Sequence, residues 1–124
     1  MATAKGNFEI NMVPQTDEKA PAGRMTLDKV YLGDMEGTGA GQMISKRIEN
    51  GAAAYFAIEE FSGTVGGKSG GFTLLHNGFM DKESQSLSIV IMEGSGSGEL
   101  EGISGSMNII QDSGNHAYEL EYEQ

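Results

Sequence analysis

The chain has 124 residues, no cysteine, and 18 acidic against 8 basic residues, for a formal net charge of −10. It can form neither disulfides nor thiolate metal sites, and its charge repels phosphate backbones and anionic lipids, so we expect no nucleic-acid or membrane partner. No apolar run approaches the ~20 residues of a membrane helix. The length predicts a single domain, and we expect one β-barrel over residues 1–124. We expect the protein to be located in the cytoplasm.

The first strand is predicted at residues 5–12, where apolar and polar side chains alternate along the chain. The polar, proline-bounded stretch at 13–23 is predicted as a loop, and residues 24–32 resume extended structure. Four glycines in nine residues exclude a stable helix after Gly33. Residues 33–45 are therefore predicted as a strand kinked at glycine.

Residues 51–65 form the most apolar segment and are predicted as a strand that is apolar on both faces. Such a strand normally has a second layer outside it, so we expect a covering loop or a subunit interface. A homo-oligomer is expected, with a dimer favoured. Residues 71–80 and 85–92 are predicted as two further strands joined in a hairpin.

The last strand shows the clearest alternation in the chain. His116, Tyr118, Leu120 and Tyr122 alternate with Ala117 and three glutamates, which predicts a half-buried strand with an acidic outer face.

A glycine-spaced unit occurs twice at an offset of 35 residues, with seven matching positions, and each copy reads as a turn and a strand kinked at glycine. The first copy comprises Gly63, Val65, Gly67, Ser69, Gly70, Phe72 and Leu74, and the second comprises Gly98, Leu100, Gly102, Ser104, Gly105, Met107 and Ile109. Repeated corner glycines are what a small closed barrel needs to coil its sheet, so the sequence predicts an all-β barrel.

Several motifs resemble known families. The run GSGELEGISGSMNI, with FEIN, GDME, AIEE and FTLLHNG in the same order, resembles the allene oxide cyclases. The pattern GRMTLDK, GD, AIE, GxSGxF, HxG and HxYxxxY resembles, over nearly the whole chain, a bacterial family known as domain of unknown function 3224. This resemblance implies an eight-stranded antiparallel β-barrel of the allene oxide cyclase-like type, often oligomeric and without an established activity.

The resemblance to the cyclases also implies a place for ligand-binding residues. The cyclases carry a glutamate and an asparagine on the first strand, and Glu9 and Asn11 stand at these positions in FEIN. The alternation of that strand instead puts both residues outside the barrel. The cyclase cysteine that lines the pocket is replaced by Tyr55.

Glu59 is the strongest candidate for a functional carboxylate. If Tyr55, Ala57 and Glu59 face inward, Glu59 lies in a narrow apolar barrel, where desolvation would raise its pKa and prepare it as a general acid or base. The alternatives are that Glu59 lies outside, or that it is paired inside with a lysine or a tyrosine hydroxyl.

His76 and His116 both lie on the apolar faces of their strands, and we predict that they line the interior together with Tyr118. Two histidines and a glutamate could bind zinc or iron, but they lie on separate strands without a local motif. We therefore predict no metal site and no cofactor.

The predicted function is the binding of a small apolar molecule inside the barrel. The alternatives are an isomerase or cyclase-like enzyme that uses Glu59 with a histidine as an acid–base pair, and a filled barrel with only a structural or interaction role.

Overall fold

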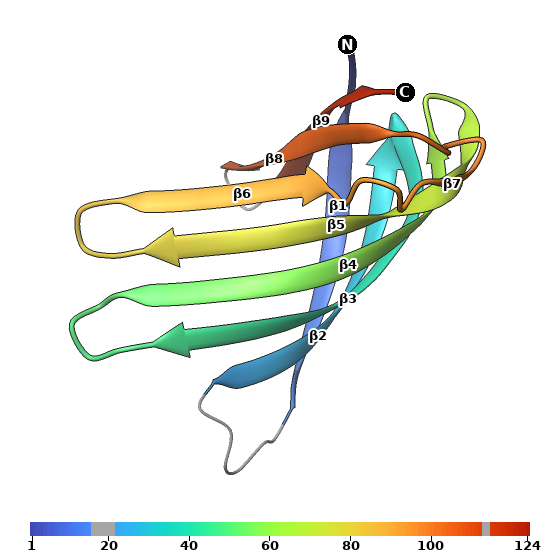
Figure 1. Ribbon diagram of the computed structural model, residues 1–124. Helices are drawn as coiled ribbons and strands as arrows, with labels where there is room; N and C mark the ends of the chain where they lie inside the picture. The colour runs from blue at the N-terminus through green and yellow to red at the C-terminus, as the bar shows by residue number, and fades with distance from the viewer. Residues whose placement is uncertain (16–21, 113–114) are drawn as a thin grey trace.

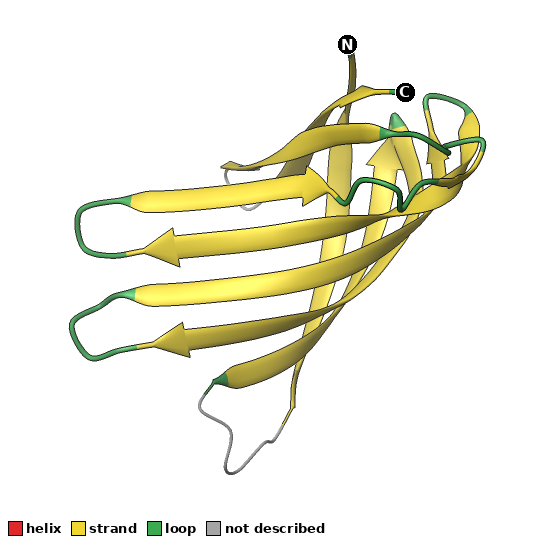
Figure 2. Ribbon diagram, in the orientation of Figure 1, coloured by secondary structure: helices red, strands yellow, loops and turns green. Residues whose placement is uncertain are grey.

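The computed structural model of the protein describes residues 1–15, 22–112 and 115–124, and every regular element in these residues is a β-strand (Figure 2). The strands are β1 (Ala2–Gln15), β2 (Gly23–Gly33), β3 (Met35–Arg47), β4 (Ala53–Val65), β5 (Lys68–Met80), β6 (Gln85–Ile91), β7 (Ser97–Gly98), β8 (Ser104–Asp112) and β9 (Asn115–Glu123). The described part of the chain contains no helix that is long and apolar enough to cross a membrane.

The strands form one closed ring (Figure 1). Neighbours follow in the order β4-β3-β2-β1-β9-β8-β6-β5, and the ladder between β5 and β4 closes it. All of these ladders are antiparallel, and β7 adds a short extra strand to β5. The prediction of an all-β, eight-stranded antiparallel barrel is confirmed. A barrel of this size has an interior that side chains just fill or that admits one small ligand.

The strand β4 is apolar on both faces, as predicted. Ala57, Glu59 and Phe61 face inward and are buried, whereas the outward-facing Phe56 and Ile58 are each 57% exposed. The described part of this chain therefore does not supply the second layer that was expected over the outer face.

The predicted loop at residues 13–23 is shorter than expected. The strand β1 continues to Gln15 and β2 begins at Gly23, so Val13, Pro14 and Gln15 are paired with β2, and residues 16–21 lie outside the described ones. Pro14 is compatible with this strand because the ladder from β1 to β9 ends at Asn7, so the other edge of β1 needs no N–H donor there.

One end of the barrel, which we call the closed end, holds both termini and the turns at residues 33–34 and 66–67 (Figure 1). The segment between β6 and β8 crosses this end, and its Leu100 and Ile103 are fully buried in the core. The Tyr118 hydroxyl ties the turn before β3 to the barrel, because it accepts a hydrogen bond from the Met35 N–H at 2.8 Å and donates to the Leu32 carbonyl at 3.0 Å. The core side chains at this end are therefore almost fully buried.

The opposite end, the open end, carries the hairpin turns at residues 48–52 and 81–84, on the left of Figure 1. Its inward-facing side chains are only partly buried, and Leu87 remains 42% exposed. The others include Ile10, Met25, Met43, Tyr55 and Ile109. The wall is also less tightly paired here, because β1 loses β9 beyond Asn7. Solvent therefore reaches the interior from this end.

The glycine repeat corresponds to matching structure. Gly67 and Gly102, which the 35-residue offset equates, both lie in turns with φ of 87° and 86°. Val65 and Leu100 are buried at equivalent points before these turns. The two copies thus build similar corners at the closed end.

Candidate functional site

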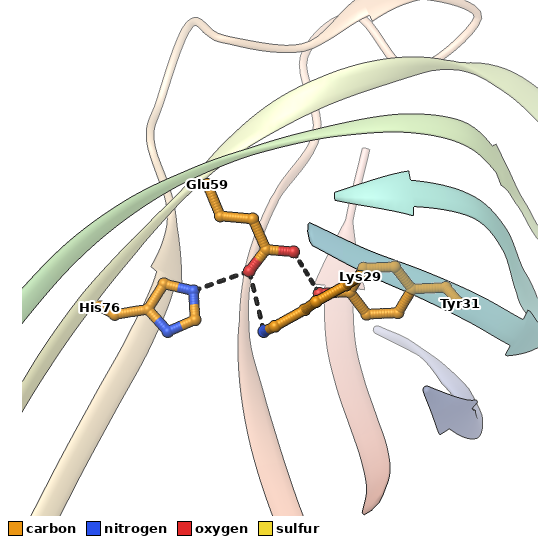
Figure 3. A network of polar contacts seen from close by, with 4 residues as sticks. All are labelled: Lys29, Tyr31, Glu59 and His76. Atoms are coloured by element: carbon orange, nitrogen blue, oxygen red, sulfur yellow. Dashed lines mark hydrogen bonds and ion pairs between the residues drawn. The ribbon is translucent and has the colours of Figure 1, made fainter. Parts of the chain in front are cut away.

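A cluster of four polar side chains lies inside the barrel around Glu59 (Figure 3). The Oε1 atom of Glu59 accepts from Lys29 Nζ at 3.0 Å and lies 2.9 Å from His76 Nε2. The other oxygen, Oε2, accepts a short hydrogen bond from the Tyr31 hydroxyl. The side chains of Glu59, Lys29 and His76 are 0%, 3% and 4% exposed, so the carboxylate itself is shielded from bulk water.

The space for this carboxylate comes from a glycine on the neighbouring strand. Gly39 of β3 faces inward next to Glu59, and a Cβ atom at Gly39 would lie well inside contact distance of Glu59 Oε2 and 3.1 Å from the Tyr31 ring. The missing side chain therefore leaves the volume that the carboxylate occupies.

The pKa of Glu59 is lowered from 4.5 to about 2. Burial raises this pKa, but the hydrogen bond from His76, the positive charge of Lys29 and the hydrogen bond from Tyr31 together outweigh the burial. The sequence-based expectation that desolvation would leave Glu59 with a raised pKa is therefore wrong. The alternative is confirmed, in which the carboxylate is paired inside with a lysine and a tyrosine.

The hydroxyl of Tyr31 stays protonated in this cluster. Burial raises the pKa of Tyr31, and the neighbouring Glu59 charge raises it further. Tyr31 is thus a permanent donor to the carboxylate.

His76 has one nitrogen that the cluster does not use. Because the Glu59 carboxylate is ionised, it can only accept, so Nε2 of His76 must carry the proton between them. No described residue hydrogen-bonds to Nδ1, yet the described residues contain no fully buried polar side-chain atom without a partner, so Nδ1 reaches solvent. Figure 3 shows this nitrogen turned away from Glu59, on the same side as Lys29 Nζ.

The strand register places His76 between the cluster and the open end. Glu59 is paired with Gly41 and Leu74, and His76 lies one row further toward the open end, paired with Ala57 and Ile89. The next row holds Tyr55 and Leu87 opposite Gly78. His76 therefore forms the polar floor of the open end.

Aromatic rings link the cluster to β9. The Lys29 Nζ atom lies 4.9 Å from the centroid of the Phe8 ring, and this ring stacks on His116 at 5.2 Å. His116 is half-buried, and it is separated from Glu59 by the Phe8 ring and Lys29. The structure thus brings His76, and not His116, to the carboxylate.

The other residues predicted for the site lie in different places. Tyr55 is at the open end, where half-burial raises its pKa, and its ring crosses Gly78. Tyr118 holds the turn at the closed end through its hydroxyl, and burial raises its pKa. Glu9 and Asn11 are exposed on the outer face of β1, as the alternation indicated.

Lys29 and Tyr31 were not named by the sequence analysis. Both share the inward face of β2 with Leu27, so the alternation already contained the signal of a lysine on an apolar face. Lys29 is 30 residues and Tyr31 is 28 residues from Glu59 in the chain. Their contacts with Glu59 depend on the register of β2, β3 and β4.

Among the described residues no group of three or more His, Asp or Glu side chains is placed to hold a metal ion. A surface depression of about 940 Å³ lies on the outer face of β2–β6 and is lined by Ile44, Phe56 and Ile58 among others. A smaller depression, of about 320 Å³, lies beside His116 where β1 and β9 separate.

The fold and the site define a small closed β-barrel with a neutralised polar cluster between a filled end and an open end. The family model described as "Protein of unknown function (DUF3224)" matches residues 4–122, and the chain belongs to this family. A crystal structure of a DUF3224 protein of unknown function from Shewanella oneidensis is similar, with 34% identity, a TM-score of 0.92, and coverage of 98% of this chain and 96% of that one. No curated protein matches the chain. The narrower likeness to allene oxide cyclases stays a prediction.

Proposed function

We propose that the protein binds one small, largely apolar molecule in the open end of the barrel, with a polar group of that molecule on His76. The observation that carries the proposal is the Nδ1 atom of His76, which belongs to a 96%-buried side chain and has no described partner. Because Nδ1 reaches solvent, a ligand group that hydrogen-bonds to it replaces water there, while the apolar part of the ligand leaves water inside the barrel. The cytoplasmic location stays a prediction.

The chemistry of His76 limits the ligand class. With its proton on Nε2, a neutral imidazole offers a lone pair at Nδ1, which accepts from a hydroxyl or carboxylic acid group. The surrounding inward-facing side chains are apolar, and Met25 and Met43 adapt easily to different shapes. Medium-chain alcohols fit this combination, and medium-chain carboxylic acids fit it in their protonated form.

Binding is tested by calorimetric titration with 1-decanol and decanoic acid, and by native mass spectrometry of freshly purified protein. The variant His76→Phe keeps a ring of similar size and removes both nitrogens, so we expect about a tenfold loss of affinity from one lost hydrogen bond. Leu87→Lys, at a position that is 42% exposed, introduces a charge at the open end and should weaken binding with little effect on folding.

The control is Ile58→Lys on the outer face, which should bind like the wild type. If Ile58→Lys loses the ligand and His76→Phe keeps it, the ligand lies in the outer depression and the proposal is wrong. Absence of binding to both probes and of any retained molecule would also contradict it.

Proton transfer on the bound molecule is a second candidate function, and one contact favours it. A carboxylate that holds one imidazole nitrogen while the other faces the substrate is the arrangement in which histidine acts as a general base. The alternative function predicted from the sequence was an isomerase or cyclase-like enzyme with Glu59 and a histidine as the acid–base pair. With a pKa of about 2, Glu59 is too weak a base near neutral pH and would instead orient His76.

This second function is tested by incubating the protein with its retained molecule or with a binding probe in D₂O. An isomerase that moves a proton through His76 should introduce deuterium at carbon, and His76→Phe should abolish the exchange. Binding without any exchange would leave the protein as a binder only.

A further inference from the structure

The outer face of β2–β6 carries apolar side chains that nothing in the described chain covers. The register aligns outward-facing residues in rows across the five strands. The central row is Thr26, Gln42, Ile58, Leu75 and Val90, and the row beside it is Arg24, Ile44, Phe56, Asn77 and Ser88. We call this surface the outer face. Ile44, Phe56 and Ile58 are 52%, 57% and 57% exposed.

We infer that the outer face pairs with the outer face of a second copy of this chain in a two-fold symmetric dimer. Large apolar side chains on adjacent strands form a contiguous patch, and such patches mark interaction sites. This patch has depth as well, because it lines the depression of about 940 Å³. Phe56 and Ile58 project from this face, whereas Ala40 and Ser88 are small. The large side chains of one copy can therefore pack over the small side chains of the other.

The area of the outer face is sufficient for a stable dimer. Five strands about 4.8 Å apart and four rows about 6.8 Å apart, two of which cross only four strands, cover roughly 600 Å² per copy, so a pair buries about 1,200 Å², at the lower limit of the range of about 1,200–2,000 Å² for specific interfaces. The fourth row consists of Lys46, Ala54, Phe79 and Ser86.

The charges on the outer face are arranged to match themselves after a two-fold rotation. Arg24 and Lys46 lie toward the open end, and both also interact within their own chain. Asp28 and Glu60 share the row on the opposite side of the central row, toward the closed end. A two-fold axis that runs along the central row through Ile58 brings the basic side of one copy to the acidic side of the other. Self-complementary charge favours a second copy over an unrelated partner.

The first experiment compares wild type, Ile58→Lys and Ile110→Lys by sedimentation over about a hundredfold range of concentration, because a dimer dissociates on dilution. Ile110 is the matched control, since it is 47% exposed on β8 outside the outer face. We expect Ile58→Lys to raise the dissociation constant of the dimer at least about tenfold and Ile110→Lys to leave it unchanged. A monomeric wild type, or equal effects of both variants, overturns the inference.

The second experiment uses the absence of cysteine from the chain. A single Ile58→Cys variant should form a disulfide-linked dimer under mild oxidation at least about tenfold faster than Ile110→Cys, because only cysteines near the axis approach within about 7 Å. Equal rates overturn the inference. So does a monomer that retains a small molecule in native mass spectrometry and loses it in Ile58→Lys. His76→Phe should leave the dimer unchanged, which separates this result from the test of ligand binding.

Discussion

The two ends of the barrel are built from the same eight strands but differ in how their interior is filled. At the closed end, Leu100 and Ile103 enter from the connecting segment and the Tyr118 hydroxyl fixes the adjacent turn. At the open end no described segment enters, and Leu87 and Met43 remain partly exposed. The cluster around Glu59 lies at the boundary. Most of the fully buried core therefore lies toward one end of the barrel, whereas the interior at the other end is partly exposed.

The largest loss of stability is expected for variants of the cluster around Glu59, at the boundary between the two ends. Lys29→Met leaves the Glu59 carboxylate buried without its cation, and Glu59→Leu leaves the Lys29 ammonium unpaired, so each should cost about 3–5 kcal/mol in chemical denaturation. The double variant Lys29→Met/Glu59→Leu removes both charges and should recover part of this loss, since the Tyr31 hydroxyl and the His76 Nε2–H still lose their acceptor. Simple addition of the two single losses would show that the pair is not coupled.

The filling of the two ends is compared directly by truncating one leucine in each. Leu100→Ala creates a cavity at a fully buried position and should cost about 3 kcal/mol. Leu87→Ala, at a 42% exposed position, should cost less than about 1 kcal/mol. Urea denaturation of both variants measures the difference. Equal losses would mean that the open end is packed like the closed one.

Low pH should reduce the contribution of the cluster around Glu59 to the free energy of unfolding. The pKa of Glu59 is about 2 in the fold and 4.5 in the reference state, so its stabilising contribution is complete above about pH 5 and is lost as the pH falls toward 2. The loss is on the order of 3 kcal/mol. The other carboxylates titrate in the same range, so the wild type is compared with Lys29→Met/Glu59→Leu. The free energies of unfolding of the two proteins should converge as pH falls, and parallel curves would contradict the assignment.

A smaller effect is expected from filling the space beside the carboxylate. Gly39→Ala places a methyl group against Glu59 and Tyr31 and should cost about 1–3 kcal/mol through overpacking. Gly23→Ala is the control, because the nearest atoms there belong to Ser45 at 3.8 Å, and its cost should stay within about 0.5 kcal/mol. Thermal unfolding of both variants provides the measurement. A neutral Gly39→Ala would show that the cluster can shift without loss.

Most of the strands, their inward faces and the all-β barrel were predictable from the local pattern of the sequence. Alternation in β1 and β9 and the apolar character of β4 are local properties, since neighbouring side chains of a strand must point to opposite faces. The same rule indicated that His76 lies inside and that Glu9 and Asn11 lie outside, whereas it left the side of Glu59 open.

Only the tertiary structure decided which inward-facing residues meet. Lys29, Tyr31 and His76 reach one carboxylate because the registers of β2–β5 align them, and Gly39 leaves the space in which they converge. The direction of the Glu59 pKa shift followed from these partners, because burial and pairing act in opposite directions and their balance depends on distance. Tyr118 was likewise assigned to the closed end by a contact with Met35, 83 residues earlier in the chain, which no local pattern encodes.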